Sequence, residues 1–290
     1  MHLPPHWAIC KMAYKVGLLL ATLLVGSLAF PKRYADVSTL YGHSDPTGRI
    51  VGGSVAPEGS IPYMVALTNG LLLRSFLCGG SLVSTRHILT AAHCINAVFS
   101  FGSLSNTLRA TVGTNRWNLG GTNYNIARNI THPNYVQAAI KNDIGLLVTS
   151  TNVALSNTVG IVALNYDFIG ANVAARVSGW GRIRQNGALS AELLQLTKTT
   201  IDGSLCVSEV ARIANQFNIN APPVEPHIEL CTFHSIDHGT CNGDSGSPLV
   251  RVDNNQQIGV VSWGVPCARG APDMYSRVSA YGTWLQQNIV

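Results

Sequence analysis

The stretch Cys241-Asn-Gly-Asp-Ser-Gly-Ser-Pro248 carries more information than any other part of this 290-residue chain. Within it, Ser245 lies in the run Gly243-Asp-Ser-Gly246. Glycines allow a tight turn and a close approach by another molecule. Such a turn can expose the serine hydroxyl and aim neighbouring N–H groups at one point. A serine hydroxyl is a weak nucleophile unless a base activates it, and the base needs a third group to orient it.

Two further segments supply a base and a carboxylate. His93 lies in Thr90-Ala-Ala-His-Cys94, and Asp143 opens the apolar run 144–148. No Asp or Glu occurs between Glu58 and Asp143. A buried carboxylate needs bonds and a partner, and His93 is the obvious candidate. The alternatives are a core histidine bonded to backbone and an aspartate that caps a helix or a turn.

A fourth segment, Arg49-Ile-Val-Gly-Gly53, places a cleavable basic residue before an apolar start. A single Gly-Asp-Ser-Gly would be weak, but the four segments in this order resemble the chymotrypsin-like serine endopeptidases. The resemblance covers residue 50 to the C-terminus. It implies that Ser245 attacks the scissile carbonyl, His93 transfers the proton and Asp143 holds the imidazole tautomer. The N–H groups of Gly243 and Ser245 would form the oxyanion hole.

The same resemblance implies activation by a cut between Arg49 and Ile50. The new ammonium group of Ile50 would be buried against Asp244 and would order the oxyanion hole. The alternative is that Asp244 is an ordinary turn residue.

The positions that resemble the family's specificity pocket depart from both trypsins and chymotrypsins. Gly239, six residues before the serine, replaces the Asp of trypsins and the Ser of chymotrypsins, and Asp273 replaces a usual Gly. This pair resembles the crustacean and insect serine collagenases and predicts broad primary specificity. The alternative is that Asp273 faces away in a local ion pair. Ser262 would support the buried carboxylate, and the backbone of 262–264 would pair with substrate. Gly264 would leave the pocket entrance open. Trp263 fits both substrate binding and core packing.

The first 49 residues have the features of processing segments. Lys11 and Lys15 precede an apolar run of about 15 residues that ends near Ala29, typical of a signal peptide over 1–29. Residues 30–49 would form an activation propeptide, and Met12 is an alternative start. An uncleaved N-terminal anchor is the other interpretation. We therefore expect a secreted, extracellular protein.

The cysteines agree with an oxidising compartment. Cys10 falls in the leader, and six cysteines remain, which permit 15 pairings into three bridges. The resemblance selects Cys78–Cys94, Cys206–Cys231 and Cys241–Cys267. A metal site is disfavoured because no Cys-x-x-Cys pair occurs.

Charge excludes one class of partner. Residues 1–49 hold five Lys/Arg and two Asp/Glu, which leaves 14 and 12 in residues 50–290. A net charge of +2 is too small for a nucleic-acid footprint.

We expect a monomer with no membrane contact and no cofactor. A calcium loop like that of trypsins needs carboxylates between His93 and Asp143, and none occur. Expected partners are protein or peptide substrates, an activating protease and protein protease inhibitors. Asn129 begins an Asn-Ile-Thr glycosylation motif.

Short apolar runs broken by Gly, Asn, Ser and Pro predict an all-β fold, either a sandwich or barrels. The resemblance implies two six-stranded antiparallel β-barrels, roughly 50–160 and 161–278, within one protease domain at 50–290. It adds a C-terminal α-helix over 279–290. The predicted strands are 61–67, 80–83, 87–90, 109–112, 144–148, 173–177, 193–200, 247–252, 258–263 and 274–278. Helical spacing predicts helices over 203–214 and 280–289.

Two other functions compete with an active endopeptidase. A non-catalytic homologue acting as a binding protein would usually have lost one of the three side chains. An esterase or lipase of another fold favours Gly-x-Ser-x-Gly, with the acid between Ser and His. The order here is His, Asp, Ser.

Overall fold

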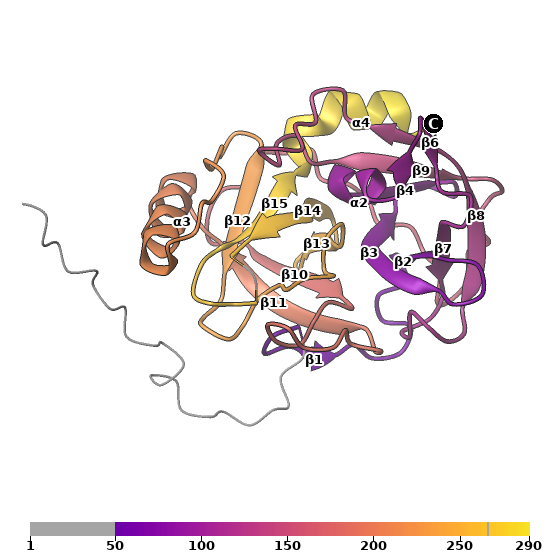
Figure 1. The fold of residues 1–290 in the computed structure, drawn as a ribbon, viewed down its shortest axis with the longest axis horizontal. Coiled ribbons are helices and arrows are strands. Elements are labelled where there is room, and N and C mark those ends of the chain that lie inside the picture. The colour runs from indigo at the N-terminus through magenta and orange to yellow at the C-terminus, as the bar shows by residue number, and fades with distance from the viewer. Residues whose placement is uncertain (1–49, 266) are drawn as a thin grey trace, which may run out of the picture. The chain divides into compact units, whose positions relative to one another are not determined.

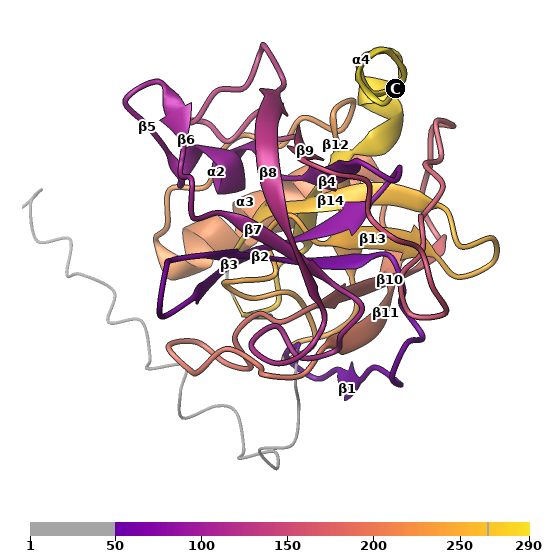
Figure 2. The same ribbon diagram turned by 90° about the vertical axis from the view of Figure 1, so that its right-hand side faces the viewer.

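The computed structural model describes residues 50–265 and 267–290. The predicted leader, Cys10 and Arg49 lie outside the described residues. Figures 1 and 2 show a fold made mostly of strands, with one group of strands early in the chain and a second group late in it.

The first group forms a closed antiparallel barrel. Its strands follow in the order β2-β3-β4-β9-β8-β7. Their bounds are Met64–Asn69 (β2), Ser75–Leu82 (β3), His87–Thr90 (β4), Gly145–Thr149 (β9), Thr122–Thr131 (β8) and Arg109–Val112 (β7). A small hairpin of β5 (Phe99–Ser100) and β6 (Ser103–Leu104) lies between β4 and β7 in the chain.

The second group forms a sheet in the order β1-β11-β10-β13-β14-β15-β12. An additional β11–β12 pairing closes six of these strands into a second barrel, with β1 attached to β11. The bounds are Ser54–Val55 (β1), Leu194–Thr200 (β11), Ala174–Gly179 (β10), Pro248–Arg251 (β13), Gln257–Gly264 (β14), Asp273–Arg277 (β15) and Glu229–Phe233 (β12). The predicted class, two six-stranded antiparallel barrels with a C-terminal helix, is confirmed.

In the described part of the chain, three α-helices lie outside the barrels. Helix α2 (Ala92–Asn96) follows β4, α3 (Gly203–Phe217) follows β11, and α4 (Gly282–Asn288) ends the fold after the 3-10 turn Val278–Tyr281. Helix α3 is three residues longer than predicted, because the left-handed Asn218 ends it rather than Asn215. Figure 1 shows α3 beside β12 and α4 above the strands of the first barrel.

Most strand predictions agree with the structure, and β4 and β7 match to the residue. The long strand β8 was not predicted, because its sequence is largely polar and half of its side chains are exposed. Strand β12 was missed too. The first described strand also differs from the expected barrel division, since β1 pairs with β11 of the second barrel.

Three disulfides join Cys78 to Cys94, Cys206 to Cys231 and Cys241 to Cys267. These are the pairs that the resemblance implies. Among the described residues, no helix is long and apolar enough to cross a membrane.

Candidate active site

The first barrel brings His93 and Asp143 into contact. His93 lies in α2, directly after β4, and Asp143 lies just before β9, which pairs with β4. The ring atom Nδ1 of His93 lies 2.8 Å from Oδ2 of Asp143, and the backbone N–H of His93 donates to Oδ1 at 2.8 Å. Two bonds to one carboxylate fix both the position and the orientation of the imidazole.

The second barrel completes this arrangement with two hydroxyls. Ser262 on β14 donates to Oδ2 of Asp143 at 2.6 Å, and Ser276 on β15 donates to the backbone carbonyl of Asp143 at 2.6 Å. Asp143 is 1% exposed. A carboxylate removed from water needs such donors, and here they come from both barrels. Asp143 is therefore held at the junction between the barrels.

Ser245 lies against the start of the helix that carries His93. Its carbonyl accepts from the N–H of Gly79 on β3 at 2.9 Å. A Cβ on the next residue, Gly246, would lie 2.2 Å from Oγ1 of Thr90 and 3.3 Å from the N of Ala91. Glycine is required there, both by this contact and by its φ of +78°.

In the described part of the chain, the hydroxyl of Ser245 forms no hydrogen bond to His93. The ring atom Nε2 of His93 lies 3.7 Å from Sγ of Cys94 instead. Catalytic hydrogen bonds are often long in unliganded enzymes and tighten when substrate binds. The structure thus brings the three chain segments together and forms the His93–Asp143 contact directly.

The turn at residues 242–246 leaves two N–H groups available. Gly243 has a φ of +102°, and neither its N–H nor that of Ser245 donates to another group in the described part of the chain. Two such donors beside a serine hydroxyl can bind a developing oxyanion.

Asp244 is fully buried next to this turn. Its carboxylate accepts from the N–H of Gly181 at 2.8 Å and from that of Cys241 at 3.0 Å. Burial raises the pKa of Asp244 to about 7, although those two N–H groups oppose the shift. Among the residues that the structure describes, Asp244 has no ion pair. Within the described residues, no cation therefore compensates the burial of this carboxylate.

Ile50 is also fully buried and packs with core residues of the second barrel, including Val177 and Leu249. Its neighbour Val51 accepts from the N–H of Gly239 at 3.0 Å. The first residues after Arg49 thus belong to the second barrel.

An open backbone edge lies beside the three segments. Strand β13 pairs with β14 over residues 257–260, so 262–264 have no ladder partner on that side within the described fold. A hollow of about 300 Å³ adjoins the edge and is lined by His93, Asn96, Ala97, Tyr135, Gln137, Ile140 and Ser262. An extended peptide could pair with this edge and reach the imidazole.

Gly239, Gly264 and Asp273 lie together at the other end of this edge. A Cβ on Gly239 would lie 3.0 Å from Oδ2 of Asp273, and one on Gly264 would lie 3.9 Å from Oδ1. Asp273 also forms an ion pair with Lys198 of β11. Asp273 is therefore in an ion pair, but its partner lies 75 residues away in the chain and is not a neighbour in sequence.

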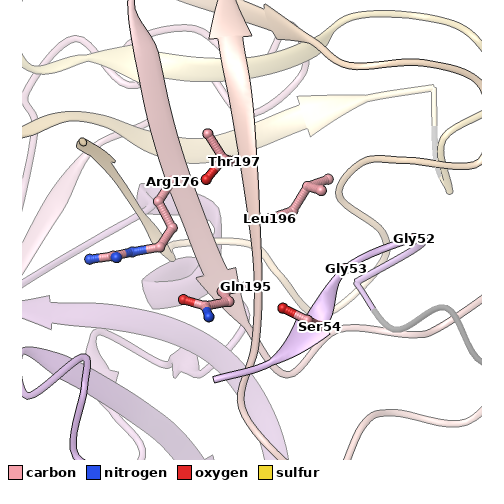
Figure 3. Close-up of a pocket in the computed structure, with 7 residues that line it drawn as sticks. All are labelled: Gly52, Gly53, Ser54, Arg176, Gln195, Leu196 and Thr197. Atoms are coloured by element: carbon pink, nitrogen blue, oxygen red, sulfur yellow. The ribbon is translucent and has the colours of Figure 1, made fainter. Parts of the chain in front are cut away.

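A second hollow, of about 340 Å³, is shown in Figure 3. Residues of β1, β10 and β11 and the segment before β1 line it, among them Ser54, Arg176 and Gln195. Gly52 and Gly53 of the activation segment line it, and none of the predicted catalytic or pocket residues does.

The possible glycosylation residue and a group of metal-ligand side chains can also be placed. Asn129 lies on β8, partly exposed, and its amide donates to Oγ1 of Thr131 at 3.1 Å. Among the described residues, the group with metal-ligand proximity is Cys78, His93 and Cys94. The two cysteines are joined in a disulfide and offer no thiolate.

Comparison with known protein families gives a match to the family described as Trypsin over residues 50–285. This chain belongs to the trypsin family. Chymotrypsin-2 of Vespa crabro is 34% identical over 240 residues, which cover 82% of this chain and 99% of that protein. Trypsin of Sus scrofa is 32% identical over 250 residues, which cover 85% of this chain and 98% of that protein. Trypsin alpha-4 of Lucilia cuprina is 32% identical over 239 residues, which cover 82% and 86%.

Trypsins and chymotrypsins are serine endopeptidases, and this trypsin-family chain is one too. Its relatives carry both names at nearly equal identity, so overall similarity does not determine which side chain the pocket accepts.

Four residues at or beside the site of this trypsin-family protein were missed in the sequence: Ser276, Lys198, Lys141 and Glu229. Lys198 occupies a buried position in the alternating pattern of β11, where Leu194 and Leu196 are also buried. That alternation was a usable signal. Lys141 and Glu229 form a buried ion pair between the barrels, and no local pattern in the sequence indicates their proximity.

Proposed function

We propose that this chain is a secreted serine endopeptidase, made as a zymogen, that hydrolyses peptide bonds through an acyl-enzyme on Ser245. The observation that carries the proposal is the His93–Asp143 contact, held by Ser262, beside the Gly243–Gly246 turn. The same arrangement argues against the alternative of a non-catalytic binding homologue, which would not need a buried, three-donor carboxylate.

Each side chain has one task in this mechanism. Ser245 Oγ attacks the scissile carbonyl carbon while Nε2 of His93 removes its proton. The leaving amine then takes that proton, and water repeats the sequence on the acyl-enzyme. Asp143 accepts a hydrogen bond from Nδ1–H of His93 at 2.8 Å, which keeps Nε2 free as the base, and its charge stabilises the imidazolium.

The oxyanion would be bound by the N–H groups of Gly243 and Ser245. Neither N–H donates to another group in the described fold, which supports this role. Losing one such donor typically costs about 2.7–4 kcal/mol of transition-state stabilisation.

Activation would follow a cut between Arg49 and Ile50. The new ammonium group at Ile50 would supply a cation for buried Asp244, and the packing of Ile50 in the core of the second barrel supports this pairing. Because Asp244 directly precedes Ser245, the pair would order the oxyanion hole.

Substrates would be proteins or peptides bound along 262–264, with Trp263 forming a wall and Gly239, Gly264 and Asp273 shaping the pocket. The proposed primary specificity is broad and of a chymotryptic or collagenolytic kind. Further proposed features are a signal peptide at 1–29, a propeptide at 30–49 and an extracellular, monomeric enzyme. We also propose protein inhibitors as partners and glycosylation at Asn129.

An active-site-directed fluorophosphonate tests the catalytic proposal. After cleavage by trypsin, the reagent should label Ser245, and Ser245→Ala should abolish labelling. His93→Ala should lower kcat by about 10⁴-fold or more, because the hydroxyl loses its base. Ser247→Ala is the matched control, since its buried hydroxyl has no partner in the described residues, and it should remain labelled. A folded, cut chain that is neither labelled nor active would indicate the binding homologue instead.

A further inference from the structure

The carboxylate of Asp273 lies at the pocket positions but is already engaged. It begins β15, opposite Gly264 of β14. Its Oδ2 accepts from the N–H of Thr240 at 2.8 Å and lies 3.0 Å from where a Cβ of Gly239 would be. The side chain is 4% exposed. Space that other side chains at 239 would fill is therefore taken up by this carboxylate.

The partner of Asp273 comes from inside the second barrel. Lys198 on β11 reaches Oδ2 with its ammonium group, and its side chain is 1% exposed. The route runs past β12, because Thr200 of β11 pairs with Thr232, which in turn pairs with Asp273. Lys198 belongs to the inward-facing series of β11 with Leu194 and Leu196, so its charge has no path to solvent.

An ion pair of this kind changes what the pocket can bind. A free carboxylate would attract a substrate lysine or arginine, and the new pair would compensate for the desolvation of both charges. Here a lysine of the chain already provides that compensation. An incoming cation would lose its water and would also meet the positive charge of Lys198.

We propose that Lys198 determines primary specificity by holding Asp273 in a buried ion pair, so that the pocket accepts uncharged, apolar side chains and rejects lysine and arginine. The inference rests on the proposed endopeptidase function. It narrows the broad specificity expected from Gly239 and Asp273 by excluding the basic class.

The test compares peptide substrates that differ in the residue before the scissile bond. Full-length chain is cut with immobilised trypsin, which is then removed so that it cannot cleave basic substrates. The wild type should have a kcat/KM for Phe or Leu about 100-fold or more above that for Arg or Lys. Lys198→Met leaves Asp273 unpaired and should shift this ratio toward Arg by about tenfold or more.

Two variants control for indirect effects. Lys198→Met/Asp273→Asn removes both charges and should keep the apolar preference. Arg212→Gln breaks the exposed ion pair with Glu209 on α3, away from the pocket, and should leave the Phe-to-Arg ratio within about twofold of wild type. A shift toward Arg in either control would overturn the assignment to Asp273.

Benzamidine, an aromatic amidinium, gives a readout independent of catalysis. Calorimetry on the cut Ser245→Ala protein should show weak binding, and adding Lys198→Met should tighten Kd by about tenfold or more. If labelling of Ser245 fails while benzamidine discriminates as expected, the proposed function is wrong and the pocket inference stands. If Lys198→Met does not fold, the wild type decides. Cleavage after Arg or Lys within about tenfold of Phe, or tight benzamidine binding, overturns the proposal.

Discussion

The protonation of Asp244 is the residue-level property that we expect to differ between the uncut and the cut chain. Its carboxylate is fully buried with two N–H donors and has no ion pair within the described residues. Desolvation raises its pKa from 3.8 to about 7, the nearby Asp273 adds to the rise, and Lys198 opposes it. In the uncut chain the carboxyl group of Asp244 therefore keeps its proton up to about pH 7.

We expect the stability of the uncut chain to depend on pH through this residue. The unfolded state releases the proton near pH 4 and the folded state near pH 7, so the folded state binds more protons between them. The contribution of Asp244 to the free energy of unfolding is fully present below pH 4 and is lost as the pH rises through 7. The loss amounts to about 4 kcal/mol.

Urea unfolding of the uncut wild type and of uncut Asp244→Asn between pH 4 and 8 measures this effect. The wild type should lose stability relative to the variant as the pH rises. A constant difference across this range would show that Asp244 ionises normally in the uncut chain.

At the scale of elements, a buried ion pair between Lys141 and Glu229 joins the two barrels. Lys141 lies in the segment that leads to Asp143 and β9, and Glu229 begins β12. Their side chains meet at 2.7 Å and are 6% and 5% exposed. Trp263 on β14 donates Nε1 to the same Oε1 at 2.7 Å, and the ammonium lies 5.1 Å from its ring. The pair therefore links the segment of the catalytic acid to the substrate edge.

We expect Glu229→Gln to lower the free energy of unfolding by about 3–5 kcal/mol, because it leaves the Lys141 ammonium buried without a counter-charge. The double variant Lys141→Met/Glu229→Gln should recover most of that loss. Arg212→Gln breaks the exposed Arg212–Glu209 pair on α3 and should cost less than about 1 kcal/mol. Denaturant unfolding of the cut protein measures all three, and equal losses for the buried and exposed pairs would contradict the argument.

At the scale of the whole described fold, the site exists because two closed barrels meet. The first supplies His93 and Asp143, and the second supplies Ser245 and the hydroxyls of Ser262 and Ser276. The first described residues also join the second barrel through Ile50 and β1. A cut at Arg49 would therefore act on the barrel that holds the nucleophile and the oxyanion donors.

Arg49→Gln tests this coupling. Incubated with trypsin, the variant should stay uncut at 49/50 and should show kcat/KM at least about 100-fold below the cut wild type, the cost of a disordered oxyanion hole. N-terminal sequencing establishes whether the cut occurred. Full activity of a chain with an intact 49–50 bond would overturn the proposed activation.

The sequence by itself predicts strands such as β4 and β7, which are short apolar runs bounded by turn-forming residues. Local patterns also indicate which side chains to expect at the site, because Ser245, His93 and Asp143 lie in short distinctive segments. They do not reveal β8, whose polar strand is defined by the neighbours β7 and β9 rather than by its own pattern.

The partners of the buried charges, in contrast, depend on the folded arrangement. Lys198 and Asp273 are 75 residues apart in the chain, and Lys141 and Glu229 are 88 apart. A local pattern can show that a charge is buried, as the alternation in β11 does for Lys198. Which opposite charge it meets depends on how strands close into a barrel, and that is a property of non-local pairing.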